Sequence, residues 1–484
     1  MGRVFFVVVV FITGLITSSC NVLELATTLV PEGEYPNAPS RQGEGDWTLM
    51  FYYNADNNLE EYMLEDMAEI QSALSPGYSL RVLVLIDRIP GFSTSTKVFG
   101  EDFTDTRLYE LTAKGPIRLS GGVVFPELNQ PETSELDMGE IQNLQKFIQW
   151  SKHYSPARNY GLIMGNHGSG LGDLDLYGAR GISYDDTNRN YITLKDFQTQ
   201  MSPQESVDLL VFDACSMNYV ELAYQLAPLQ GGIPNTGFSA QWMVASPVEV
   251  VAEGFAYNLI FQLLLNAFDQ KRPVAPTPAE VGTLFLEGQQ LYLKPLYETG
   301  STFQYTSFHS IMTYSVINLS QLDQFKTQLD QLATQLTADK SIVLSTIFGT
   351  AIGQSISNSS LLYYFDESSL FDWQYYPGVD AYSLLEQLAK APEFSPLLPQ
   401  IETCLESLDA ALYDSFASAD YPRFLKGKNG LALFFPKGNL LRFGKPLWSH
   451  QTWYSPDRLK WCEIGQQADN AQVDNYFELL DTWW

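Results

Sequence analysis

The sequence predicts an α/β fold in which helices flank a mostly parallel central sheet, a doubly wound arrangement. Short apolar runs at 82–86, 160–165 and 207–212 are bounded by Gly or Asp, which is typical of buried parallel strands. Helical periodicity lies between these runs, and the interval from His167 to Cys215 leaves room for the crossover connection that parallel neighbours need.

The elements of the first half follow from local patterns taken along the chain. Asp56, Asn57 and Asn58 are suitable helix N-caps, and acidic residues after them favour a helix start. The predicted strands up to residue 270 are 47–53, 82–86, 106–112 at a sheet edge, 160–165, 207–212 and 242–246. The predicted helices are one from the caps to about 74, then 138–153, 217–227 and one that ends at 268.

A Pro-rich stretch at 271–279 is the best internal boundary. We expect an α/β domain at 46–270 and a smaller α+β region at 271–484 that packs on it, because 484 residues allow about two to four domains. Beyond the boundary we expect helices at 279–292, 319–336, 381–388 and 397–416, and strands at 309–318 and 430–436.

The N-terminus predicts an exported and lipidated protein. A positive charge precedes a short apolar run at 4–16, and the small residues before Cys20 resemble a bacterial lipoprotein cleavage site, from which Thr17 departs. We expect residues 1–20 to be a lipoprotein-type signal segment with the lipid on Cys20, and 21–45 to be a flexible tether. The protein would then be anchored in a bacterial cell envelope, at the outer membrane or cell surface. A plain signal peptide and an uncleaved anchor are the alternatives.

The chain is strongly acidic, with 56 acidic residues, 28 basic residues and a net charge of −28. This balance argues against nucleic acid as a partner, because a phosphate backbone requires a basic surface. It favours the attraction of basic peptides, or else it is a solvated surface without a partner. Hydrophobic residues make up 45% of the chain, so a sizeable core can form.

Two reactive residues follow two of the predicted strands. His167 comes after the strand at 160–165 in a Gly-rich segment, and Cys215 comes after the strand at 207–212. Ligands of open α/β sheets bind at the carboxyl ends of strands, so we expect the two side chains to meet in one site. They would form a thiol nucleophile beside its base, and a helix directly after Cys215 would stabilise the thiolate. A core histidine and an inert buried thiol are the alternatives.

These residues and the blocks around them resemble the clostripain family of cysteine endopeptidases, relatives of caspases, gingipains and legumain. The family pattern is a strand that ends in His-Gly, then a strand that ends in Asp-Ala-Cys, which this chain has at His167 and at Asp213 to Cys215. Further family-like blocks lie at 47–60, 82–88 and 181–187. The resemblance covers 47–257 best and implies a caspase-like α/β sandwich.

The resemblance also implies an endopeptidase that cleaves after Arg, or less often Lys, with Cys215 as nucleophile and His167 as proton shuttle. The backbone N–H groups of Gly168 and Cys215 are implied as the oxyanion hole. In the family, the Asp two residues before the nucleophile helps to form an acidic S1 pocket, which here is Asp213. Glu249 is the candidate for the second wall of that pocket, and no obligate third member of a triad is expected.

The loop after His167 carries two further implications of the resemblance. Family members are often cut there, which makes Arg180 and Arg189 candidates for self-cleavage, with an intact single chain as the alternative. No cofactor is expected to be required, but calcium dependence in the family makes the acidic residues of the loop candidates for Ca²⁺, with surface turns as the alternative. These acidic residues are Asp173, Asp175, Asp185 and Asp186, whose spacing is not that of an EF-hand.

Two cysteines remain. Cys404 and Cys462 can form a disulfide in an exported protein or stay as separate buried thiols. No Cys-x-x-Cys spacing indicates a metal site.

Two other functions are compatible with these observations. One is a surface-anchored binding lipoprotein on a caspase-like scaffold without turnover, because a fold does not fix a function. The other is a hydrolase that uses the same dyad on amides or esters that are not peptides.

Overall fold

The computed structural model describes most of the chain from Gly45 onward. The predicted signal segment, with Cys20, and all but the last residue of the predicted tether lie outside the described residues. The described ranges are 45–130, 134–171, 181–268, 274–298, 312–336, 378–418 and 424–435, with short pieces at 365, 441–442, 445–446, 459–463 and 480.

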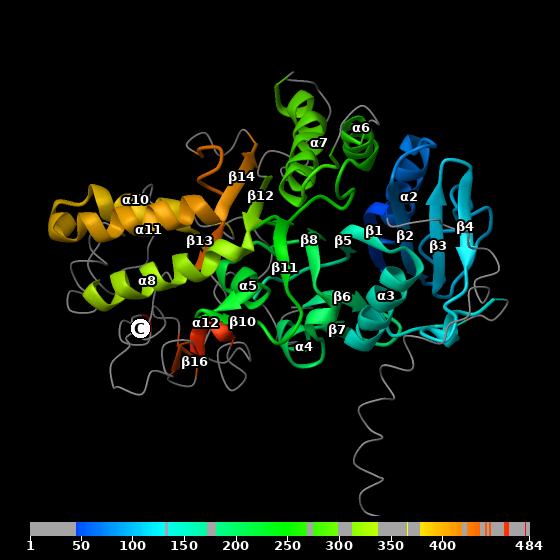
Figure 1. The fold of residues 1–484 in the computed structure, drawn as a ribbon, viewed down its shortest axis with the longest axis horizontal. Helices are drawn as coiled ribbons and strands as arrows, with labels where there is room; N and C mark the ends of the chain where they lie inside the picture. The colour runs from blue at the N-terminus through cyan, green and yellow to red at the C-terminus, as the bar shows by residue number, and fades with distance from the viewer. Residues whose placement is uncertain are drawn as a thin grey trace, which may run out of the picture.

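A nine-stranded sheet forms the centre of the protein, in the order β14-β12-β11-β8-β5-β1-β2-β3-β4 (Figure 1). The five central strands, from β11 to β2, are mutually parallel, and antiparallel pairs continue the sheet at both edges. The expected α/β fold with a mostly parallel sheet is confirmed. The strands are β1 (Gly45–Ala55), β2 (Leu80–Arg88), β3 (Arg107–Thr112), β4 (Gly115–Leu119), β5 (Ala157–Gly165), β8 (Val207–Asp213), β11 (Ala240–Ala245), β12 (Thr313–Asn318) and β14 (Leu412–Ala417).

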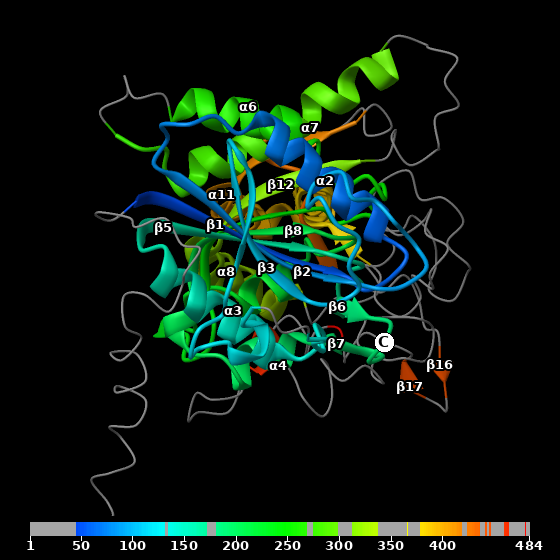
Figure 2. The same cartoon turned by 90° about the vertical axis from the view of Figure 1, so that its right-hand side faces the viewer.

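Helices cover both faces of the sheet and create two hydrophobic cores (Figure 2). Successive side chains of a strand point to opposite faces, so Leu49 and Phe51 of β1 enter one core and Met50 and Tyr52 the other. The first core is covered by α2 (Glu60–Ala73), α6 (Tyr257–Ala267) and α7 (Pro278–Glu298). The second is covered by α3 (Ile141–Tyr154), α4 (Leu194–Thr199), α5 (Val220–Gln225), α8 (Leu322–Leu336), α10 (Ala381–Lys390) and α11 (Leu398–Ala411).

Three sequence predictions need correction. The strand β3 is not at the edge of the sheet, because β4 pairs with it in a hairpin and forms the edge. Pro116 and Arg118 interrupt the apolar pattern of β4, so this strand was not predicted from the sequence. The helix predicted at 397–416 ends at Ala411, and the following residues form β14, which pairs with β12. The helix predicted at 217–227 is limited to the short α5.

The predicted domain boundary at 271 lies within one continuous sheet. β12 and β14 come from the region after the boundary, and β12 pairs with β11 from the region before it. The division into a domain and a C-terminal region therefore stays a prediction. Across the described ranges, no helix combines the length and the apolar character that crossing a membrane requires.

The region after residue 271 also contacts the loop that follows Cys215. A small two-stranded antiparallel sheet of β13 (Gly378–Asp380) and β15 (Ala432–Phe434) contains the strand predicted at 430–436. The Ala432 N–H donates to the Asn218 carbonyl at 3.0 Å, and the Asn218 side chain donates to the Gly430 carbonyl at 2.6 Å. These contacts fix the cysteine loop against the C-terminal region.

Candidate active site

His167 and Cys215 lie beyond the carboxyl ends of two neighbouring parallel strands. Gly165, the last residue of β5, is directly opposite Asp213, the last residue of β8, and each reactive residue lies two positions further on. The two loops are in contact, because a Cβ added to Gly168 would lie only 2.4 Å from the Cys215 carbonyl oxygen. Only glycine fits there, so the glycine after the histidine allows the two loops to approach closely.

The half-buried His167 contacts a residue that the sequence suggested only as a helix cap. Its Nε2 atom lies 2.9 Å from Oδ1 of Asn58, which lies in the connection between β1 and α2. When Nε2 carries the proton and donates to Asn58, the nitrogen with the lone pair that can take up a proton is Nδ1. Asn58 thus favours the tautomer in which the imidazole can act as a base through Nδ1.

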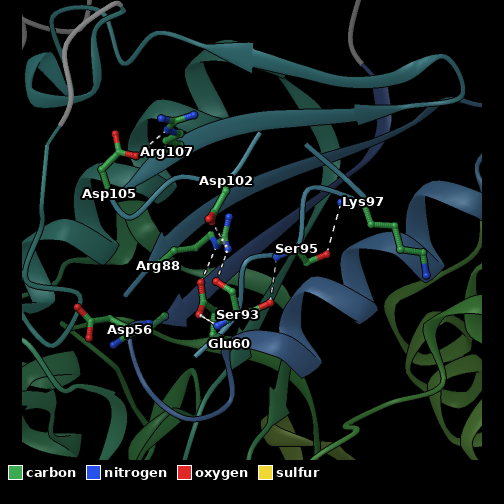
Figure 3. Close-up of polar contacts among 10 residues, drawn as sticks. Asp56, Glu60, Arg88, Ser93, Ser95, Lys97, Asp102, Asp105 and Arg107 are labelled. Atoms are coloured by element: carbon green, nitrogen blue, oxygen red, sulfur yellow. Dashed lines mark hydrogen bonds and ion pairs between the residues drawn. The ribbon is translucent and has the colours of Figure 1, made fainter. Parts of the chain in front are cut away.

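A buried ion pair anchors the connection that carries Asn58. The Nε of Arg88 lies 2.7 Å from Oε1 of Glu60, the first residue of α2, and both side chains are fully buried (Figure 3). The other oxygen of Glu60 accepts a hydrogen bond from the Ser93 N–H, and Arg88 also pairs with Asp102 at 3.1 Å. Loss of one member of such a pair would leave an uncompensated buried charge, so the start of α2 is firmly held.

A hairpin formed by β6 (Ile182–Asp185) and β7 (Asn190–Ile192) clasps the residues around His167. The side chain of Asn166 donates to the carbonyls of Asn54 and Tyr184 at 2.6 and 3.1 Å, and it accepts from the Tyr184 N–H at 3.0 Å. The Ser169 N–H donates to the Gly181 carbonyl. The histidine segment is therefore held between the end of β1 and the hairpin.

Cys215 is half-buried beside the loop that follows β11. The Val250 N–H donates to its Sγ at 3.4 Å. Burial, with a smaller contribution from the carboxylates of Glu249 and Asp213, raises the pKa of Cys215 to about 11. The expected helix directly after the cysteine is absent, since α5 begins only at Val220 and Ser216 has a φ of 59°. The prediction that a helix N-terminus stabilises the thiolate is wrong, and burial instead favours the neutral thiol.

Asp213 ends β8 with its carboxylate held by the segment before α6. The Tyr257 hydroxyl donates to Oδ2 at 2.9 Å, and the Phe255 N–H lies 3.5 Å from the same oxygen. Gly254 packs so closely that a Cβ there would lie 2.8 Å from Oδ2. Burial raises the pKa of Asp213, the hydrogen bond from Tyr257 opposes part of this increase, and the resulting pKa is about 6. The carboxylate is therefore ionised in most molecules at pH 7.

Glu249 lies in the same loop that contacts the thiol. It is half-buried, burial raises its pKa, and its Oε1 atom accepts no hydrogen bond from the described residues. The loop is tied to the cysteine segment by the Ser216 N–H, which donates to the Val248 carbonyl at 2.9 Å. Glu249 and Asp213 thus place two carboxylates near Cys215.

Gly168, one of the two residues predicted for the oxyanion hole, packs against the carbonyl of Cys215, which is the other. Within the described ranges, neither the Gly168 nor the Cys215 N–H donates to a backbone or side-chain oxygen.

Comparison with known proteins identifies the family. A family model described as the clostripain family, Peptidase C11, matches residues 51–483. Clostripain of Hathewaya histolytica is 32% identical over 477 residues, which covers 90% of this chain and 86% of the relative. The chain belongs to the clostripain family.

Solved structures of clostripain-family proteins share the fold. A secreted C11 cysteine protease from Bacteroides thetaiotaomicron, solved with an irreversible peptide inhibitor, matches with a TM-score of 0.56 at 17% identity, covering 87% of this chain and 99% of that one. An inactive zymogen C11 protease from Parabacteroides distasonis matches with a TM-score of 0.53 at 17% identity, covering 88% and 99%. The expected caspase-like fold is confirmed, and the protein is a cysteine endopeptidase of the clostripain family.

Other residues predicted from the clostripain resemblance are only partly within the described ranges. Arg180, Asp173 and Asp175 lie outside them. Arg189 is exposed, with a φ of 55°, in the turn between β6 and β7. Asp185 is fully buried.

The remaining cysteines are both in helices. Cys404 is a free, buried thiol in α11, and burial raises its pKa. Cys462 belongs to α12 (Lys460–Glu463).

Asn58 and Tyr257 are residues of the site in this clostripain-family chain that were not predicted from the sequence. The position of Asn58 could have been predicted, since this residue follows β1, a parallel neighbour of β5, and therefore lies at the same edge of the sheet as His167. No sequence pattern indicated Tyr257, because its partner Asp213 is distant in sequence and the contact depends on how the loop after β11 folds back.

Proposed function

We propose that this clostripain-family endopeptidase cleaves peptide bonds after Arg, and less readily after Lys, with Cys215 as the nucleophile and His167 as its acid–base partner. The observation that carries the proposal is the pairing of Gly165 with Asp213 and the close contact of the two loops beyond them. This arrangement supports an imidazole and a thiol that act together at the carboxyl edge of the sheet, where α/β enzymes bind substrates. Family membership favours this function over a binding lipoprotein without turnover.

The reaction follows from the protonation states of the two residues. Nδ1 of His167 accepts the thiol proton as Sγ of Cys215 bonds to the scissile carbonyl carbon. The N–H groups of Gly168 and Cys215 stabilise the oxyanion. The imidazolium then returns its proton to the leaving amine as the C–N bond breaks, and a water molecule, deprotonated by His167, hydrolyses the thioester and restores the thiol.

The specificity follows from the carboxylates that flank the thiol. Asp213 offers a carboxylate whose Oδ2 is already oriented by Tyr257, so that a substrate guanidinium meets a fixed acceptor. A planar guanidinium can bind such a group in bidentate fashion, whereas an ammonium binds only as a point charge. Glu249 would add a second carboxylate, and the net charge of −28 would attract basic peptides.

A library of fluorogenic peptides that varies the P1 residue tests this function on residues 21–484. We expect Arg to be preferred over Lys, and both over Leu and Asp. Cys215→Ala and His167→Ala should each remove nearly all turnover, with non-additive effects because the residues act as a unit. Substantial cleavage by purified Cys215→Ala, or a preference for amides or esters that are not peptides, would reject the proposal.

We also propose that Cys20 carries a lipid that anchors the enzyme in a bacterial cell envelope. Palmitate labelling should be present in the wild type and absent in Cys20→Ser, which should leave the membrane fraction. Retention of Cys20→Ser in membranes after a carbonate wash would indicate a membrane-spanning anchor instead.

We further propose self-cleavage after Arg180 or Arg189. Arg189 is exposed in a turn, which is the kind of position that proteases reach. Mass spectrometry of purified wild type and Cys215→Ala should show the cut only in the wild type. A fully active, intact wild-type chain would exclude cleavage as an activation step.

A further inference from the structure

Three residues lie side by side at the carboxyl edge of the sheet, on neighbouring parallel strands. Tyr53 of β1 pairs with Gly165 of β5, and Gly165 pairs with Asp213 of β8. The middle residue has no side chain, and a Cβ added to Gly165 would lie only 2.7 Å from Cε1 of Tyr53. The ring of Tyr53 therefore lies over Gly165 and extends toward Asp213.

A chain of hydroxyl groups connects Asp213 to a second carboxyl group, that of Asp66 on α2. The Tyr257 hydroxyl donates to Oδ2 of Asp213 at 2.9 Å. The hydroxyls of Tyr257 and Tyr53 are hydrogen-bonded to each other, and the Tyr53 hydroxyl lies 3.4 Å from Oδ2 of Asp66. Both tyrosines and Asp66 are buried, so the chain runs through the protein interior, where an unsatisfied polar group is costly.

The number of hydrogens determines how this chain is arranged. Each tyrosine has a single O–H group, and that of Tyr257 is used by Asp213. The link between the two tyrosines therefore needs the O–H of Tyr53, and the last contact needs a hydrogen from Asp66. An ionised Asp66 has no hydrogen to donate and would take the O–H of Tyr53 for itself. The complete chain thus exists only while Asp66 is a carboxylic acid.

The surroundings of Asp66 favour the carboxylic acid. Burial holds the pKa of Asp66 well above its ordinary value, and neighbouring carboxylates act in the same direction. These carboxylates belong to Asp213, Glu69 and Glu65. Among the residues that the structure describes, every ion pair involves other carboxylates, so no cation offsets this effect. Asp66 therefore keeps its proton at neutral pH.

Asp213 is the carboxyl group of the two that becomes ionised. It is half-buried, whereas Asp66 is buried, and the Tyr257 hydroxyl stabilises its charged form. Two other titratable groups face it, Tyr314 and Cys215, and burial raises the pKa of both, so both are neutral at pH 7. The distances of 2.9 and 3.4 Å agree with this assignment, because a hydroxyl approaches a charged carboxylate more closely than a neutral one.

We propose that Asp66 is a positioning residue for the S1 carboxylate, which it holds ionised and oriented by donating its acid hydrogen into the chain of the two tyrosines. This inference rests on the proposed role of Asp213 in binding a substrate Arg. A hydroxyl that accepts a hydrogen bond becomes a better donor, so the bond from Asp66 strengthens the bond that Asp213 receives. Asp66 acts through Tyr53 and Tyr257.

The pH dependence of KM for P1 Arg peptides tests this coupling, because it reports the ionisation of Asp213. Asp66→Asn keeps a donor, so its limb should remain at the wild-type position near pH 6. Asp66→Leu has no donor, and its limb should move to higher pH by about 0.2–0.7 pH units, with little change for Leu peptides. A limb that moves to lower pH in Asp66→Asn would mean that an ionised Asp66 repels Asp213, which overturns the proposal.

Tyr53→Phe tests the middle of the chain and remains available if Asp66→Leu does not fold. It removes the hydroxyl but keeps the ring over Gly165, so the limb should move in the same direction as in Asp66→Leu. The double variant should shift the limb no further than the larger single shift, because one broken chain cannot be broken twice. A limb that stays at the wild-type position in Tyr53→Phe would overturn the proposal.

Thermal unfolding tests the proton on Asp66 without any substrate. The chain carrying Cys215→Ala, which prevents self-cleavage, is compared with and without Asp66→Asn between pH 5.5 and 8. The Tm difference in favour of Asp66→Asn should grow as the pH rises, because the unfolded chain releases the proton of Asp66 above about pH 4 and the folded protein retains it. The matched control is Glu65→Gln, the adjacent exposed carboxylate, whose Tm difference should stay constant.

The two measurements separate failure of this inference from failure of the proposed function. A Tm difference for Asp66→Asn that does not change with pH would mean that Asp66 is ionised in the folded protein, and the inference fails whatever the substrate. Absence of a preference for P1 Arg in the wild type would reject the proposed function before any variant is compared.

Discussion

Nε2 of His167 lies 2.9 Å from Oδ1 of Asn58, although His167 follows β5, Asn58 follows β1, and the two residues are 109 positions apart in the sequence. The contact resembles the role of an orienting group in a catalytic triad, because it sets which imidazole nitrogen holds the proton. Asn58 would act through the imidazole of His167, so it is a positioning residue.

Replacement of Asn58 tests that role. Asn58→Ala should lower kcat by about 10- to 100-fold, since small misplacements of a catalytic group have effects of this size. KM should change little, and the limb of the pH profile that reports His167 should move to lower pH, because an acceptor that stabilises the imidazolium is lost. Asn58→Asp, which keeps an acceptor oxygen, should recover part of the rate. An unchanged kcat and pH profile in Asn58→Ala would assign the contact a structural role only.

The reactivity of the thiol should depend on pH in a way that reflects its burial. Burial raises the pKa of Cys215 to about 11, so the thiolate fraction should still be increasing well above neutral pH. We expect inactivation of the resting enzyme by iodoacetamide to accelerate steadily from pH 7 to 10, roughly tenfold per pH unit. A plateau below pH 8 would instead indicate a preformed pair of thiolate and imidazolium. Cys215→Ala provides the background rate.

The sequence predicted the scaffold better than the contacts. The strands β1, β2, β5 and β8 were predictable because each is an apolar run with a clear boundary, and their parallel pairing places the residues after them at one edge. The hydrogen bond from Tyr257 to Asp213 and the contact between Tyr53 and Asp66 were not predictable, because they depend on how separate loops and helices pack over that edge.

The incorrect predictions have a common physical cause. Apolar spacing alone does not distinguish the end of a helix from the start of a strand, so α11 was expected to continue through β14. The helix after Cys215 was likewise expected too early, and with it a stabilised thiolate. The packing of the loop after β11 against the thiol was the missing information.

The charge of Asp213 should determine selectivity for Arg. Asp213→Asn should reduce kcat/KM for P1 Arg peptides by about 10²-fold or more, in line with ~3–5 kcal/mol for breaking a buried charge pair. Cleavage after neutral residues should fall much less, and Glu249→Gln should have a smaller effect on Arg. Parallel assays with P1 Arg, Lys, Leu and Asp decide the matter. A wild-type preference for Leu, or unaltered Arg selectivity in Asp213→Asn, would make Asp213 a structural turn residue.

Tyr257 should set the pH range over which Arg is recognised. The pKa of Asp213 is raised from its ordinary value to about 6, so the carboxylate is charged above pH 6, and KM for Arg peptides should increase as the pH falls through this value. The hydroxyl of Tyr257 stabilises the charged form, so Tyr257→Phe should raise the pKa of Asp213 and move this limb to higher pH.

The comparison that isolates Tyr257 uses two substrates and a second tyrosine. In Tyr257→Phe, KM for Arg peptides should rise at pH 6 to 7 and recover toward the wild-type value near pH 9, while kcat/KM for Leu peptides should keep its wild-type pH profile. Tyr154→Phe is the matched control, since the hydroxyl of Tyr154 donates to Glu110 at 2.9 Å rather than to Asp213, and it should leave the limb in place. Equal losses on Arg and Leu peptides at every pH would show that Tyr257 only supports the fold.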